Sequence, residues 1–132
     1  MHSQIYVNLP VNDLAKSRAF FESMGYAFNP DYSNDKGACL VLGDNLFAML
    51  LTVDFFKTFI DRPIGDARKA TSVLVCVSCK DRAQVDGLVS NAVAAGGTLP
   101  RAAVDHGFMY QHAFEDLDGH IWELVAMASS AP

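Results

Sequence analysis

The chain has 132 residues, of which 51% are hydrophobic and 19% are charged, and its formal net charge is −5 at pH 7. These values suit one domain with its own core and exclude a disordered chain. The negative charge, without any basic cluster, argues against nucleic acid as a partner, and no apolar run approaches the roughly 20 residues that span a bilayer.

The N-terminus and the cysteines indicate the compartment. No basic stretch leads into an apolar core, so we expect no signal peptide and a cytoplasmic protein that binds no membrane. Cys76 and Cys79 have the Cys-x-x-Cys spacing, but they lie on one predicted strand, where their thiols would point to opposite faces. Because no second pair completes a zinc site, we expect reduced thiols rather than a metal or redox centre.

The first half of the chain predicts one strand, one helix and three short strands. Apolar and polar residues alternate at the start, Asp13 offers an N-cap with Asn12, and Gly25 stops the helical pattern. In chain order, the expected elements are a strand at 5–11, a helix at about 14–24 and strands at 26–28, 38–42 and 46–53. A connecting segment follows at 54–70.

The second half repeats this order. Asp81 can cap a second helix, Gly96 and Gly97 can end it, and residues 116–119 (Asp-Leu-Asp-Gly) form a strong turn signal. The expected elements are a strand at 72–79, the helix, a strand near 98 and strands at 108–115 and 120–126. Matching Val11 with Val77 pairs Tyr6 with Ser72. The sequence therefore predicts an α+β fold of two βαβββ modules in one domain covering 1–132, with modules at about 1–62 and 63–132.

Two stretches carry a resemblance to a known superfamily. Residues 7–25 (VNLPVNDLAKSRAFFESMG) and 114–124 (FEDLDGHIWEL) resemble the opening strand and helix and the closing hairpin of the vicinal oxygen chelate superfamily. This group contains glyoxalase I, bleomycin-resistance proteins and extradiol dioxygenases, and the chain looks especially like a bacterial branch labelled predicted lactoylglutathione lyase. The resemblance implies mixed, curved sheets that enclose a small-molecule cavity.

The resemblance also implies positions for a divalent metal, one on the first and one on the fourth strand of each module. These positions fall on Tyr6, on Leu50 (or Met49 if the register slips by one), on Ser72 and on Glu123. Only Glu123 is a usual ligand for such a metal, and a lone carboxylate does not hold a transition metal against water. We therefore expect no metal and no other cofactor.

Glu123 and His112 are the candidate catalytic residues. If residues 116–119 form the whole loop, Glu115 pairs with His120 and His112 lies directly opposite Glu123, about 5 Å away, as a polar centre in the cavity. The alternative is a half-exposed strand histidine bonded to its neighbours. Glu123 itself could act as a general base, as a ligand anchor or as a structural carboxylate.

Strand alternation adds candidates for ligand binding on the cavity side. They are Tyr6, Asn8, Ser72, Cys76 and Tyr110. Each could instead be ordinary sheet packing.

Two functions follow as expectations. The first is a binding protein for a small, aromatic or carbonyl-containing molecule, like the metal-free bleomycin-resistance members. The alternative is a lyase or isomerase of the glyoxalase or dioxygenase type that uses Glu123, with His112 or a bound divalent metal. We also expect a homodimer, the commonest closed assembly.

Overall fold

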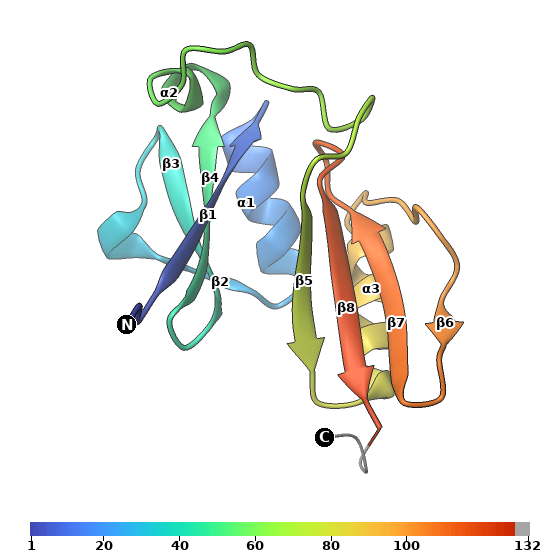
Figure 1. Cartoon of the computed structure of the whole chain (residues 1–132). Coiled ribbons are helices and arrows are strands. Elements are labelled where there is room, and N and C mark those ends of the chain that lie inside the picture. The colour runs from blue at the N-terminus through green and yellow to red at the C-terminus, as the bar shows by residue number, and fades with distance from the viewer. Residues whose placement is uncertain (129–132) are drawn as a thin grey trace. The chain divides into compact units, whose positions relative to one another are not determined.

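The computed structural model describes residues 1–128 and divides the chain into two compact units, Met1–Gly65 and Asp66–Pro132. Each unit is a βαβββ module with one four-stranded mixed sheet, so the predicted α+β fold of two modules is confirmed (Figure 1). No helix in the described part of the chain is long and apolar enough to cross a membrane.

The first unit begins with β1 and contains a sheet in the strand order β1-β4-β3-β2. Its elements are β1 (Ile5–Val11), α1 (Leu14–Ser23), β2 (Ala27–Asn29), a 3₁₀ turn at Pro30–Tyr32, β3 (Gly37–Gly43), β4 (Leu46–Thr52) and α2 (Val53–Lys57). The Asp13 side chain caps α1 by accepting the Lys16 N–H, as predicted. The core lies between α1 and one sheet face, where Phe21, Leu40 and Leu50 are fully buried.

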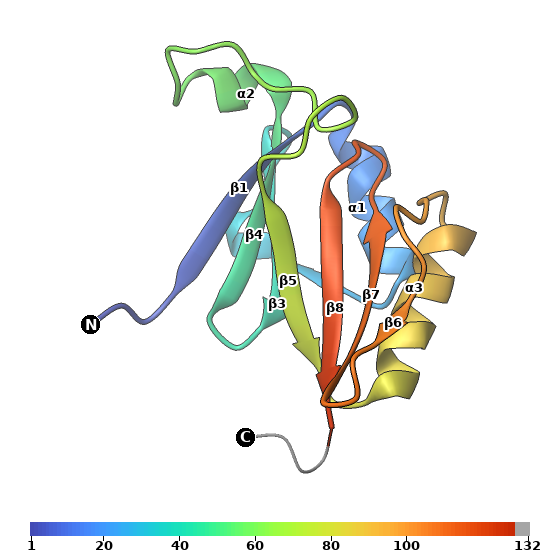
Figure 2. The same ribbon diagram turned by 45° about the vertical axis from the view of Figure 1, so that its right-hand side comes forward.

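The second unit carries the candidate site and repeats this plan in the strand order β5-β8-β7-β6. Its elements are β5 (Leu74–Cys79), α3 (Arg82–Ala94), β6 (Val104–Asp105), β7 (Met109–Glu115) and β8 (Ile121–Met127). β5 and β8 run parallel, whereas the other pairs are antiparallel. α3 lies along one face of this sheet (Figure 2), and Asp81 caps it, as predicted.

Alternation along β7 and β8 separates the two faces of the second sheet. The face toward α3 is closed: Phe114, Trp122 and Leu124 are almost fully buried there, with Val85 of α3. We call the opposite one the open face, because no helix of this unit covers it. It carries Cys76, Gln111, Ala113, Glu123 and Val125.

The turn between β7 and β8 fixes the register of the open face. The Asp116 N–H donates to the His120 carbonyl (3.0 Å) and the Gly119 N–H to the Asp116 carbonyl (3.2 Å), with Gly119 at a φ of 85°. This is a three-residue hairpin loop closed by a left-handed residue. Glycine is required at position 119 for two reasons. The first is its positive φ, and the second is that a Cβ there would lie 3.1 Å from the Arg68 backbone nitrogen.

The side chain of Asp116 holds that turn together. Its Oδ1 accepts the N–H groups of Asp118 and His120, and its Oδ2 accepts the indole N–H of Trp122 (3.0 Å). The carboxyl group is 4% exposed, and burial raises its pKa.

Most predicted elements are confirmed within two residues, but two details differ. The expected strand near 98 is only an isolated bridge between Thr98 and Glu115, and the second strand of this unit is the unpredicted β6. Within the expected connecting segment, the short helix α2 was also unpredicted.

Candidate functional site

The predicted pairing of His112 with Glu123 is wrong by one residue. Ala113 lies opposite Glu123, and His112 lies opposite Leu124 on the face toward α3. The reason is the turn: the expected four-residue loop would have paired Glu115 with His120, whereas the observed loop pairs it with Ile121. Because successive side chains alternate between faces, this shift moves the imidazole to the side of the sheet opposite the Glu123 carboxylate.

Glu123 instead belongs to a hydrogen-bond chain that the sequence analysis did not identify. The Gln111 amide Nε2 donates to Glu123 Oε2 at 2.9 Å, and Gln111 Oε1 lies 3.3 Å from His106 Nε2. A carboxylate only accepts hydrogen bonds, so the amide nitrogen of Gln111 must face it and the amide oxygen must face His106. His106 therefore carries its proton on Nε2, and the chain runs from His106 through Gln111 to Glu123.

These residues line a pocket of about 170 Å³ in the second unit. Its wall includes Arg101, Val104, His106, Gln111, Ala113 and Glu123. His112 borders it too, but both of its ring nitrogens are buried and have no hydrogen-bond partner among residues 1–128. A pocket with apolar walls and a few convergent polar groups can bind a small molecule.

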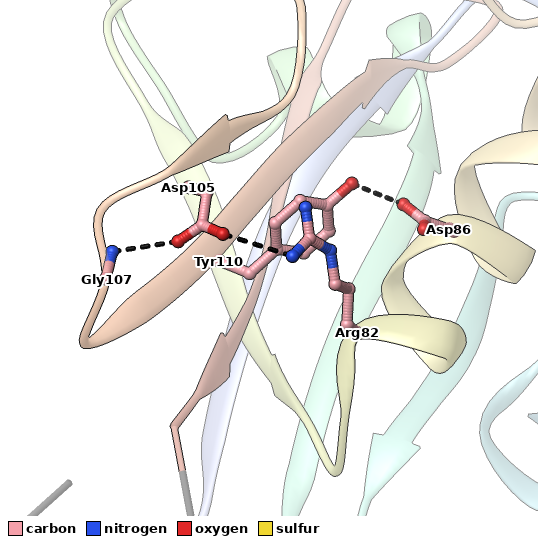
Figure 3. A network of polar contacts seen from close by, with 5 residues as sticks. All are labelled: Arg82, Asp86, Asp105, Gly107 and Tyr110. Carbon is pink, nitrogen blue, oxygen red and sulfur yellow. Dashed lines mark hydrogen bonds and ion pairs between the residues drawn. The ribbon is translucent and has the colours of Figure 1, made fainter.

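Tyr110, predicted to bind a ligand from the cavity side, lies on the face toward α3 and belongs to a different cluster (Figure 3). Its hydroxyl donates to Asp86 Oδ1 at 2.5 Å, and the Arg82 guanidinium lies 4.1 Å from the centre of its ring. The hydrogen bond to Asp86 raises the pKa of Tyr110. These contacts fix β7 to the first turns of α3.

The same cluster holds the segment that precedes β7. Arg82 forms an ion pair of 3.1 Å with Asp105, whose other oxygen accepts the Gly107 N–H at 2.8 Å (Figure 3). That backbone hydrogen bond lowers the pKa of Asp105, and the Arg82 charge lowers it further. Since His106 lies between these two anchored residues, the cluster positions the imidazole at the end of the hydrogen-bond chain.

Cys76, a predicted ligand-binding residue, lies beside Glu123 on the open face. The two residues are partners in the parallel pairing of β5 with β8. The Cys76 thiol is exposed, and its pKa is raised first by partial burial and second by the Glu123 charge. It therefore borders the carboxylate as a neutral thiol, whereas Cys79 belongs to the other face, as predicted.

The repeat of this pairing shows which residue of the first unit corresponds to Glu123. Asn8 and Cys76 each lie five residues before a helix N-cap, and they pair with Met49 and Glu123, respectively. Met49 is therefore the counterpart of Glu123. Leu50 is fully buried on the side of the sheet that packs against α1.

The same counting corrects the predicted match of Tyr6 with Ser72. Tyr6 and Leu74 each lie seven residues before their N-caps, whereas Ser72 precedes β5 and is exposed. Tyr6 is 45% exposed, stacks on Phe47 with 5.0 Å between ring centres and donates its hydroxyl hydrogen to Gln4 (3.0 Å).

Asn8, the remaining predicted ligand-binding residue, shares the sheet face of Tyr6, and its side chain is exposed. Tyr6 and Asn8 thus lie on one face of the first unit, while Cys76 and Glu123 lie on the open face of the second.

Comparison with known proteins agrees with this architecture. A family model described as bleomycin resistance protein-like N-terminal matches residues 4–43. Similar solved structures include a glyoxalase-related enzyme from Fulvimarina pelagi (23% identity, TM-score 0.79, 96% of this chain and 88% of that one). Another is a glyoxalase/bleomycin resistance protein/dioxygenase family enzyme from Burkholderia phytofirmans PsJN (19%, 0.77, 93% and 97%).

A third similar structure is the fosfomycin resistance protein FosX from Listeria monocytogenes (19% identity, TM-score 0.68, 100% of this chain and 96% of that one). No curated protein sequence matches the chain. Likeness at these identities shows the fold, and the family model adds a sequence match over the first strand and helix. The chain therefore has the fold of the vicinal oxygen chelate superfamily, and the resemblance that its sequence predicted is confirmed.

Proposed function

We propose that this protein binds a small aromatic or carbonyl-containing molecule, and that Glu123 is the anchor of its binding pocket. The observation that carries the proposal is the hydrogen-bond chain of Glu123, Gln111 and His106 in the wall of the 170 Å³ pocket. Gln111 holds one carboxylate oxygen, and the other has no hydrogen-bond partner among residues 1–128. A carbonyl compound with a hydroxyl group, or a phenol, can donate to that second oxygen.

The proposal includes the loss of the superfamily's metal site, because the side chains at its positions do not suit a divalent cation. Tyr6 offers a protonated hydroxyl that is bonded to Gln4, and Met49 offers a thioether. Leu74, which takes the place of the predicted Ser72 as the counterpart of Tyr6, has no ligand atom in its side chain, so Glu123 is the single carboxylate. Elemental analysis of the purified protein tests this part, and a stoichiometric divalent metal would contradict it.

Calorimetric titration with phenol, hydroxyacetone and benzaldehyde tests the binding function. We expect Glu123→Gln, which keeps the shape and removes the charge, to weaken binding of hydrogen-bond donors by about tenfold or more. Glu22→Gln on the exposed side of α1 is the matched control and should leave affinity unchanged. Unchanged affinity in Glu123→Gln would contradict the proposed anchor.

A second candidate function is a lyase or isomerase in which Glu123 is the general base. It is favoured by the carboxylate oxygen that Gln111 leaves without a partner. Exchange of the hydrogens next to the carbonyl of hydroxyacetone in D₂O, followed by NMR, measures this chemistry. Under this reading Glu123→Gln should slow the exchange roughly 10²–10⁴-fold while affinity survives.

We also propose that the protein is a homodimer. The edge strands β1 and β5, with the residue before β5, leave large apolar side chains exposed, and a second chain could cover them. These side chains are Ile5, Tyr6, Val73 and Leu74. Light scattering should give a particle of two chains, and a monomer at working concentration would contradict the proposal.

A cytoplasmic location is proposed as well. All three cysteines are free, as is usual in a reducing compartment. Fractionation of cells with a specific antibody tests this location.

A further inference from the structure

The pocket of the second unit contains two opposite charges that do not pair. Arg101 and Glu123 both line it, yet no ion pair or hydrogen bond joins them. Arg82 of the same unit, by contrast, forms an ion pair with Asp105. Arg101 also makes no hydrogen bond to any residue of 1–128. One cationic residue and one anionic residue, not paired with each other, thus line the same small pocket.

The edge of β7 adds a backbone donor and acceptor to this space. β6 pairs with β7 only at Tyr110 and Gln111. The next pairing along the same edge of β7 is the bridge between Thr98 and Glu115. Both the N–H and the carbonyl of Glu115 bond to Thr98, so these groups point toward the edge. Since backbone directions repeat every two residues, the N–H and carbonyl of Ala113 point the same way, into the gap.

Those two groups of Ala113 are available to a ligand. Neither β6 nor the Thr98 bridge pairs with Ala113, and its backbone makes no other hydrogen bond along this edge within residues 1–128. Ala113 also lines the pocket together with Arg101 and Glu123. One residue of a facing strand would fill such a gap with its own N–H and carbonyl, which have the matching spacing.

We infer that this pocket takes a small zwitterion with an ammonium group and a carboxylate on the same carbon, as in a free α-amino acid. The ammonium donates to Glu123 and to the Ala113 carbonyl, and the carboxylate accepts from Arg101 and from the Ala113 N–H. The volume of 170 Å³ lies below the roughly 300–1,000 Å³ of drug-sized pockets, which fits a compact ligand. This inference rests on the proposed function and specifies its ligand class.

Titration of the full-length protein, followed by calorimetry and by the Ala113 amide signal in NMR, tests the inference. The probes are L-alanine and L-phenylalanine, with ethylamine and propionate as single-charge analogues and phenol as a neutral one. We expect the amino acids to shift the Ala113 signal and to bind about tenfold or more tightly than either single-charge analogue. Glu123→Gln and Arg101→Gln should each remove that preference.

A control variant and two further outcomes distinguish the amino-acid inference from the proposed function. Arg62→Gln, at an exposed arginine of the first unit, should bind like the unaltered protein. If phenol binds in a way that depends on Glu123 while neither amino acid does, the inference is wrong and the proposed function stands. If no probe perturbs Ala113 or depends on Glu123, both are overturned.

Discussion

Gln111 and Glu123 are joined across β7 and β8 by a hydrogen bond of 2.9 Å from an amide to a carboxylate. They are diagonal neighbours on the open face, because Ala113 is the residue directly opposite Glu123. One oxygen of the carboxylate is thereby fixed in place. The orientation of the proposed anchor consequently depends on a residue that has no charge of its own.

Replacing Gln111 with Glu should destabilise the protein at neutral pH. Two carboxylates would then face each other across the strands, and like charges in that position repel. We expect the free energy of unfolding in urea to fall by about 1 kcal/mol at pH 7 and to recover near pH 4, where carboxylates begin to bind protons. Gln4→Glu, at an exposed site in the first unit, is the matched control, and an equal loss there would contradict this account.

The reactivity of Cys76 should report the charge of Glu123. Partial burial and then the Glu123 carboxylate raise the pKa of the thiol, so Glu123→Gln should bring its pKa part of the way back. Alkylation by iodoacetamide at pH 8 should become faster, because the thiolate is the nucleophile. The measurement uses variants that retain one cysteine each.

Cys79 provides the internal control for this experiment. Its pKa is raised by burial, Asp81 and Cys76 rather than by Glu123. Its alkylation rate should be the same with and without the Glu123→Gln change. A rate that changes equally for both thiols would show that the substitution had loosened the sheet.

Local sequence patterns predicted most of the fold. Alternation located β1 at its observed bounds, and the caps Asp13 and Asp81 located both helices. Glycines at positive φ, Gly25 and Gly96, follow the two helices as the sequence predicted. These features depend on neighbours within a few residues, and such neighbours are visible in a single sequence.

The candidate site was harder to predict because it depends on one register. An Asp-x-Asp-Gly turn signal fits a four-residue loop as well as the observed three-residue loop with Gly119 at positive φ. The correct loop would have placed Gln111 on the face of Glu123. His106 and Arg101 lie beside a two-residue strand and in a loop, where no periodic pattern marks a partner distant in sequence.

His112 should be dispensable for binding and costly for stability. Its ring nitrogens are buried without a hydrogen-bond partner in the described structure, and an unsatisfied buried polar group costs free energy. We expect His112→Leu to raise the free energy of unfolding by about 1 kcal/mol and to leave ligand affinity unchanged. His2→Leu at the exposed N-terminus is the control. A large loss of affinity in His112→Leu would show that this residue takes part in binding.

Acid should loosen the segment that positions His106, because that segment depends on the charge of Asp105. The Gly107 N–H and Arg82 lower the pKa of Asp105 from its ordinary value of 3.8. A lowered pKa in the folded state means that this carboxylate contributes stability above the unfolded value and loses it as the pH falls through the folded one. In NMR titrations from about pH 5 to about pH 2, the Gly107 amide signal should therefore move at a lower pH than ordinary aspartate carboxyls titrate. Asp105→Asn should abolish that movement and flatten the fall in stability with acid, whereas Asp61→Asn in the first unit should do neither. A Gly107 signal that moves in the same way in Asp105→Asn would show that another group controls this segment.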